Sequence, residues 1–132
     1  RVSVDLTPKY YYVHRTDSIT TSEYKKTDRC VITAYEKNKK IVEECYPQYK
    51  AVAEFRLFWS YYYVLDKMLL SKGKVLKEEK KEIASFLKKN WRAIIKNPYV
   101  GRGRKIATAA LRIGIPFYKI FLLQYRRGRK RI

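Results

Sequence analysis

The second half of this 132-residue sequence almost completely lacks acidic residues. Residues 72–132 hold 19 Lys/Arg against 3 Asp/Glu, and no acidic residue follows Glu82. Residues 1–71 are nearly balanced, with 12 Lys/Arg and 9 Asp/Glu, so most of the net charge of +19 belongs to the second half. A field of one sign favours an anionic partner, which is nucleic acid, an acidic membrane face or a polyphosphate ligand.

Cysteine and histidine are scarce, which limits disulfide and metal chemistry. The chain has two cysteines, Cys30 and Cys45, and one histidine, His14. Two cysteines at this spacing on one helix lie roughly 22 Å apart, whereas a disulfide needs Cα atoms within about 7 Å. A zinc site needs more ligands than these three residues provide. We therefore expect two reduced thiols, a cytoplasmic protein and no metal site in this chain.

Several sequence patterns of enzymes are also missing. Gly101-Arg-Gly-Arg is not followed by the Gly-Lys-Ser/Thr of a phosphate-binding loop. Ser18 and Ser22 have no His/Asp pair of the kind that activates a serine nucleophile. The start carries no signal-peptide pattern, and because it reads Arg1 rather than Met we expect further sequence upstream.

The first 15 residues predict two short strands. Val2, Val4 and Leu6 alternate with polar residues, as in a half-buried strand. Pro8 lies in a turn, and the run YYYVHR over residues 10–15 has high strand propensity. Because two strands alone are marginal in water, we expect them to belong to a larger sheet.

After Ser18 the hydrophobic period becomes helical and predicts about four helices. Ser22 can cap the first, which carries both cysteines. Pro47 begins a central helix over about 47–71, apolar on nearly every side, and Gly73 ends it. A third helix covers 77–96 and stops at Asn97-Pro98, and a last one runs over about 105–127 with a kink at Pro116. The expected fold is mainly α, a helical bundle preceded by one or two short β-strands.

The last helix combines cations with apolar residues. Lys105, Arg112, Lys119 and Arg126 are seven residues apart, a spacing that places them on one stripe. Cations inside the apolar stretch disfavour a spanning helix. Two interpretations remain open, a helix lying in the membrane interface and an ordinary amphipathic helix packed on its neighbours. The candidates for membrane binding are Lys105, Arg112, Phe117, Lys119, Ile120, Phe121, Arg126 and Arg127.

The segment YYYVHRTDSIT, residues 10–20, resembles the segment that closes the catalytic domain of bacterial family 2 glycosyltransferases. That pattern is a strand with Tyr-x-Tyr-Arg, two or three polar residues, then Ser-Ile-Thr or similar. It is matched by Tyr10, Tyr12, Arg15, Ser18, Ile19 and Thr20, while Val13 stands where an arginine often follows the second tyrosine. The helices that follow, rich in Tyr, Phe and Lys, and the tail FYKIFLLQYRRGRK resemble the C-terminal helical extension of such enzymes.

The resemblance implies a parent enzyme with a GT-A-like α/β domain that moves a sugar from a nucleotide-sugar donor to a polysaccharide or lipid-linked acceptor. Residues 1–20 would be the terminal strands and turn of that domain, and residues 21–132 its helical extension. The family's Asp-x-Asp motif, which holds Mg or Mn at the donor diphosphate, and its catalytic base are not in this sequence. We therefore expect no catalytic residue here and no activity of the fragment alone.

Four residues of the matched segment are candidates for the donor or acceptor site: His14, Arg15, Tyr12 and Ser18. Cationic donors can stabilise charge that develops on a leaving diphosphate, and His14 could also reach the metal in the parent. The competing interpretation places the tyrosines in a core, gives Arg15 a surface ion pair and leaves His14 without a role.

Other function classes stay open. Aromatic and basic residues together can stack on bases and neutralise phosphates, so a basic helical nucleic-acid-binding module is the main alternative, although no recognised module organises these residues. A purely helical interaction domain is a third reading. For the enzyme we expect a cytoplasmic protein, peripheral at the inner face of the membrane, with an anionic membrane surface as partner. A homodimer is left open.

Overall fold

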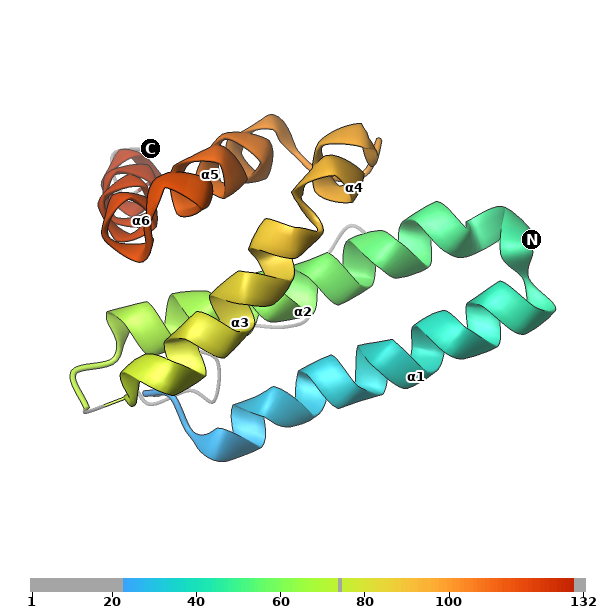
Figure 1. Ribbon diagram of the computed structural model, residues 1–132, viewed down its shortest axis with the longest axis horizontal. Coiled ribbons are helices and arrows are strands. Elements are labelled where there is room, and N and C mark those ends of the chain that lie inside the picture. The colour runs from blue at the N-terminus through green and yellow to red at the C-terminus, as the bar shows by residue number, and fades with distance from the viewer. Residues whose placement is uncertain (1–22, 74, 130–132) are drawn as a thin grey trace, which may run out of the picture.

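The computed structural model describes residues 23–73 and 75–129, and in this part the chain is a mainly α-helical bundle, as expected (Figure 1). Six α-helices and two short 3-10 turns follow one another in the described residues. The strands expected within residues 1–15 lie outside them. The last two helices, α5 and α6, lie on the opposite side of α2 from α1 (Figure 1).

Helices α1 (Cys30–Cys45) and α2 (Lys50–Leu70) form an antiparallel hairpin (Figure 1). Each is entered through a 3-10 turn, Lys26–Arg29 before α1 and Pro47–Tyr49 before α2, so α1 begins later than the expected cap at Ser22. A residue before proline is disfavoured in the helical region, and Tyr46 accordingly leaves it with φ −141° and ψ 58°. Both cysteines are free and exposed at opposite ends of α1.

Helix α2 is the central helix, as its sequence predicts. It supplies the largest share of the buried apolar residues, among them Leu57, Phe58, Tyr61, Tyr62, Val64, Leu65, Met68 and Leu69. The helix ends at Leu70, where Ser71 adopts extended backbone with ψ 137°, so the stop comes before Gly73 rather than at it. Helices that surround α2 therefore meet one continuous core.

The third helix expected over 77–96 is two helices, α3 (Lys77–Lys89) and α4 (Trp91–Lys96). The break is at Asn90, whose side-chain Nδ2 donates to the carbonyl of Phe86 over 2.9 Å. Such side-chain bonding to the backbone competes with the regular ladder and bends helices. Ile83, Leu87 and Ile94 of these two helices are buried, whereas Ile95 is 38% exposed.

The last helix expected over about 105–127 is also two helices, α5 (Arg102–Ile113) and α6 (Ile115–Arg129). Pro116 has no backbone N–H and its ring would clash with the carbonyl four residues earlier, so the helix cannot continue through it. The chain extends at Gly114 and Pro116 takes the first turn of α6, where proline is tolerated. The outcome is a break with a change of direction, where the sequence suggested a kink.

Candidate functional site: the α5–α6 outer face

Large apolar side chains of α5 and α6 stand in solvent. Ile113 is 72% exposed and Ile106 is 58% exposed. Four large hydrophobic residues of α6 are between 41% and 55% exposed: Phe117, Ile120, Leu123 and Tyr125. We call this surface the α5–α6 outer face; its apolar residues are Ile106, Ile113, Phe117, Ile120 and Leu123. Single exposed apolar residues are normal on proteins, but five of them on two consecutive helices make a candidate interaction surface.

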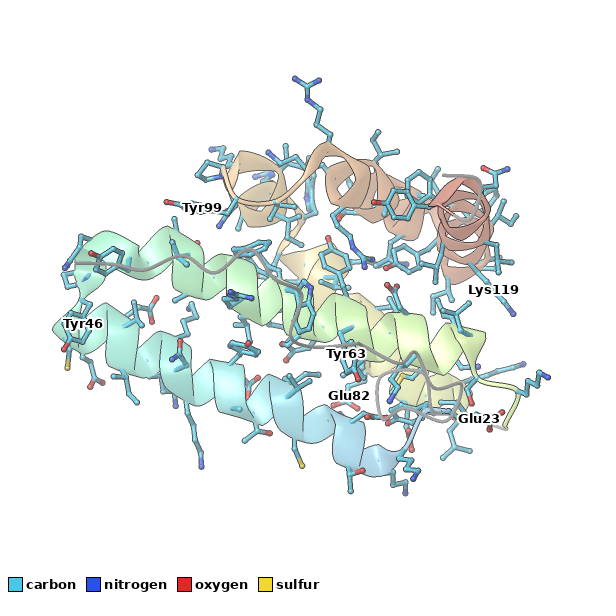
Figure 2. The ribbon with its side chains drawn as sticks, turned by 180° about the vertical axis from the view of Figure 1, so that it is seen from behind. Glu23, Tyr46, Tyr63, Glu82, Tyr99 and Lys119 are labelled. Atoms are coloured by element: carbon cyan, nitrogen blue, oxygen red, sulfur yellow. The ribbon has the colours of Figure 1, made fainter. Side chains whose placement is uncertain are left out.

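Cations accompany this outer face. Arg102, Arg112 and Lys119 are exposed, and Lys105 is half-buried. The Lys119 side chain points away from the bundle (Figure 2). The Arg112 guanidinium lies 4.1 Å from the centre of the Trp91 ring, which places this charge against α4. Since no acidic residue follows Glu82 in the sequence, α5 and α6 contribute only positive side-chain charge.

The opposite sides of α5 and α6 are buried, so the outer face is set by helical phase. Ala107, Thr108 and Leu111 of α5 are at most 2% exposed, and Tyr118 of α6 is fully buried. Side chains of one helix that lie three or four residues apart share a face. Burial of this inner face turns the intervening residues, Ile106 and Ile113 on α5 and Phe117 and Ile120 on α6, towards solvent.

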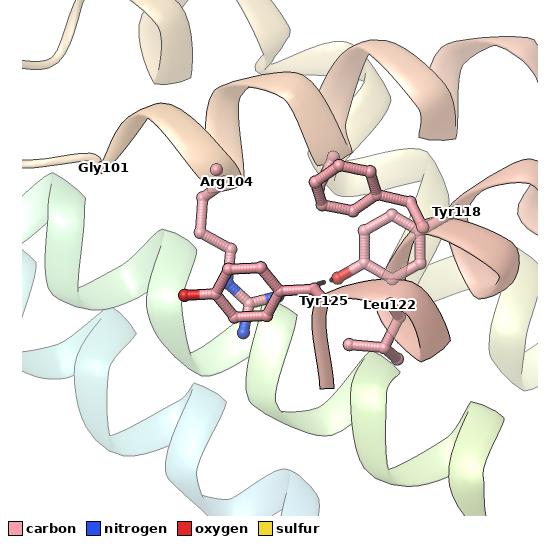
Figure 3. A pocket seen from close by; sticks show the side chains of 8 residues that line it. Gly101, Arg104, Tyr118, Leu122 and Tyr125 are labelled. Atoms are coloured by element: carbon pink, nitrogen blue, oxygen red, sulfur yellow. Dashed lines mark hydrogen bonds between the residues drawn. The ribbon is translucent and has the colours of Figure 1, made fainter. Parts of the chain in front are cut away.

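A polar network beneath the pair joins it to α2. The Arg104 guanidinium donates to Asp66 over 2.8 Å and to the Tyr118 hydroxyl over 3.0 Å. The Tyr118 hydroxyl in turn donates to the other oxygen of Asp66 over 2.6 Å. Tyr62 and Thr108 also share a hydrogen bond. Figure 3 shows the contact between Arg104 and Tyr118 as a dashed line. One carboxylate thus holds a residue of α5 and a residue of α6.

Burial and charge shift the pKa values in this network. Burial raises the pKa of Tyr118, and the negative charge of Asp66 raises it further. Burial also raises the pKa of Tyr62. Burial alone would lower the pKa of Arg104, but attraction to Asp66 outweighs it and the pKa is raised. At neutral pH both tyrosines are therefore neutral donors and Arg104 is a cation.

The structure separates the membrane-binding candidates that the sequence suggested. The prediction that four cations share one stripe is wrong. Lys105 and Arg112 lie on α5, whereas Lys119 lies on α6, across the break at Gly114. Phe117 and Ile120 are on the outer face, but Phe121 is half-buried and packs on the core. Arg126 and Arg127 belong to α6, and their side chains lie outside the described part.

The donor- and acceptor-site candidates, Tyr12, His14, Arg15 and Ser18, lie outside the described residues. The residues that sequence reasoning missed are Asp66, Arg104 and Tyr118. A signal for them existed, since Asp66 is the one acidic residue between Glu54 and Glu78 and stands in an apolar helix. A charge in that setting needs a partner.

Residues 23–73 and 75–129 contain neither a membrane-spanning helix nor a cluster of metal ligands. No helix there has the length and apolar character to cross a membrane. No group of three or more His, Cys, Asp or Glu side chains there could hold a metal ion.

Comparison with known proteins gave no match: no family model, curated protein or solved structure is similar to this chain.

Replacing Asp66 by asparagine should lower the free energy of unfolding by about 2 kcal/mol, because Arg104 keeps its charge without a carboxylate. Breaking a fully buried pair costs about 3–5 kcal/mol, and the Arg104 side chain is 38% exposed, so part of that cost is relieved by water. Urea unfolding followed by circular dichroism measures the change.

The matched control is Glu82→Gln, which breaks the pair of Glu82 with Arg29 on the surface. Those side chains are 61% and 35% exposed, and exposed pairs contribute at most about 1 kcal/mol. Equal losses from the two substitutions would mean that the network under α5 and α6 is no more important than a surface ion pair.

Proposed function

We propose that this chain is the C-terminal helical part of a family 2 glycosyltransferase and that the α5–α6 outer face docks the enzyme on an anionic membrane surface. The observation that carries the docking is the exposed apolar cluster of α5 and α6 together with cations and no acidic side chain on either helix. Docking at the inner face of the membrane would bring the active site of the parent close to a lipid-linked acceptor.

Two physical contributions support binding to an anionic leaflet. Each Lys or Arg close to such a surface adds about 1 kcal/mol to the binding free energy. Arg102, Arg112 and Lys119 are exposed and can make this contribution. Apolar side chains that enter the interface add the hydrophobic contribution. Because α5 and α6 are short amphipathic helices with cations along them, they fit a helix pair that lies on the bilayer.

The chemistry of the outer face favours lipid over nucleic acid. Proteins that bind single strands stack bases on aromatic rings, but four of the five apolar residues here are aliphatic: Ile106, Ile113, Ile120 and Leu123. The nearest tryptophan, Trp91, already lies under Arg112. Aliphatic side chains gain little from bases and gain free energy from acyl chains, so a membrane is the better partner.

The glycosyltransferase part of the proposal rests on the sequence. Its support is the matched segment YYYVHRTDSIT and the helices rich in Tyr, Phe and Lys that follow it. The Asp-x-Asp motif, the metal and the catalytic base would belong to the parent enzyme upstream. In that arrangement residues 1–20 close the catalytic domain, and the helices support it and hold it at the acceptor.

Replacing Phe117 and Ile120 together by serine should weaken binding to anionic vesicles at least tenfold. Both side chains are about half exposed, and loss of about 1 kcal/mol from each amounts to more than a factor of ten in affinity. The measurement is co-sedimentation of the protein with vesicles of anionic or neutral lipid across a salt series.

Replacing Tyr46 and Tyr49 by serine serves as the control, because these tyrosines are 54% and 58% exposed at the far end of the α1–α2 hairpin. This variant should bind vesicles like the wild type. The docking proposal would be contradicted if vesicle binding did not depend on lipid charge. It would also be contradicted if the Phe117/Ile120 variant bound like the wild type with an unchanged circular dichroism melt. Binding of single-stranded nucleic acid instead of vesicles would favour the alternative function.

In the full-length enzyme, alanine at His14 or Arg15 should lower turnover of the nucleotide sugar by about 2 kcal/mol or more in transition-state stabilisation. The reason is the proposed contact of a cationic donor with the leaving diphosphate. Steady-state release of the nucleotide measures the loss, and Lys9→Ala, immediately before the segment, is a control. Near-normal turnover of both variants would leave the segment as scaffold.

A further inference from the structure

A small cavity opens between α5 and α6. Its volume is about 120 Å³. The walls come from α6 and from the first half of α5, as the close view shows (Figure 3). The residues that line it are Gly101, Gly103, Arg104, Ala107, Tyr118, Phe121, Leu122 and Tyr125.

Glycine and alanine on α5 leave this space open. A Cβ atom added at Gly103 would lie 3.6 Å from the Tyr125 ring, at ordinary contact distance, so a longer side chain there would project among the lining groups. Ala107 presents only a methyl group. On the α6 side the Phe121 and Tyr125 rings stack with an interplanar angle of 14° and centroids 6.4 Å apart.

The interior suits an apolar group. Arg104 is the one charged residue of the lining, and Asp66 pairs with it, while the Tyr118 hydroxyl is engaged by the same carboxylate. The rest of the lining is mainly carbon, with the Tyr125 hydroxyl and the backbone of Gly101 and Gly103 as further polar groups. An apolar cavity of roughly 150 Å³ can hold benzene, so a cavity of 120 Å³ has room for about five carbon atoms.

The surroundings are positive. Arg102 and Lys105 belong to the first turn of α5, beside the lining residues Gly101, Gly103 and Arg104. Neither helix that forms the cavity carries an acidic residue. Because the interior is mainly apolar and the first turn of α5 is cationic, the complementary ligand is an amphiphile with an anionic head and a hydrocarbon chain.

We propose that this cavity takes the end of one acyl chain of an anionic membrane lipid, whose phosphate lies against the basic first turn of α5. The inference deepens the proposed function, since it adds binding of a single lipid molecule to docking on a surface. A lipid bound in the cavity would hold α5 and α6 at the membrane through a defined site, in addition to the contact made by the outer face.

The test uses monomeric octyl phosphate as the probe, below its micelle concentration. Isothermal titration should show saturable binding with one site to the whole chain. Gly103→Leu fills the cavity and should weaken this binding at least tenfold. Leucine is a better helix former than glycine, so the variant should fold. Ala109→Leu adds the same side chain at an exposed position of α5 outside the lining and should bind as the wild type does.

A second measurement does not depend on any substitution. Nuclear Overhauser contacts between the octyl chain and the ring protons of Phe121 and Tyr125 are expected in the wild type. Absence of these contacts, equal affinity of Gly103→Leu, or binding of inorganic phosphate as tight as that of octyl phosphate would overturn the proposal.

Vesicles separate this proposal from surface docking. Gly103→Leu should still co-sediment with anionic vesicles, because Phe117 and Ile120 are unchanged. Binding of octyl phosphate without any binding of vesicles would support the lipid site in the cavity and contradict docking through the outer face. Binding of vesicles without binding of octyl phosphate would support docking through the outer face and contradict the lipid site in the cavity.

Discussion

The ion pair between Asp66 and Arg104 sets the position of α5 and α6, and the proposed docking depends on it. Asp66 accepts from Arg104 of α5 and from Tyr118 of α6 with its two oxygens. Both contacts exist only when each helix turns its inner side towards α2. Since helical phase then fixes the remaining residues, the carboxylate beneath the pair determines which apolar side chains reach solvent. The outer face is therefore a consequence of the core.

Two of the three acidic residues of the second half bind residues that precede α1. Glu79 and Glu82 of α3 face the start of α1, where Glu79 accepts from Tyr24 and Glu82 pairs with Arg29. Lys67 of α2 pairs with Asp28 in the same region. Neither α5 nor α6 has an acidic residue of its own. Asp66 of α2 pairs with Arg104 from beneath. An anionic leaflet is a partner that would compensate this charge.

Much of the bundle could be predicted from sequence, because periodicity and proline positions act locally. The central position of α2, its entry at Pro47 and the stop at Asn97 before Pro98 are confirmed. The breaks at Asn90 and Gly114 were not predicted, since apolar periodicity continues across both. The network of Asp66, Arg104 and Tyr118 joins residues up to 52 positions apart, and periodicity carries no information on such pairs. Because the sequence predicted one continuous helix across Gly114, it wrongly placed four cations on one stripe. For the same reason it placed Phe121 among the exposed residues, whereas Phe121 packs on the core.

The most direct test of the account is to find which tryptophan approaches the lipid. Trp91 lies under Arg112, at the edge of the α5–α6 pair, whereas Trp59 stacks on Tyr63 of α2 and is 39% exposed. Trp59→Phe and Trp91→Phe leave one reporter each, because the chain has two tryptophans. On anionic vesicles with brominated acyl chains, the account predicts that fluorescence of Trp91 is quenched more strongly than that of Trp59. Equal quenching, or stronger quenching of Trp59, would contradict docking through α5 and α6.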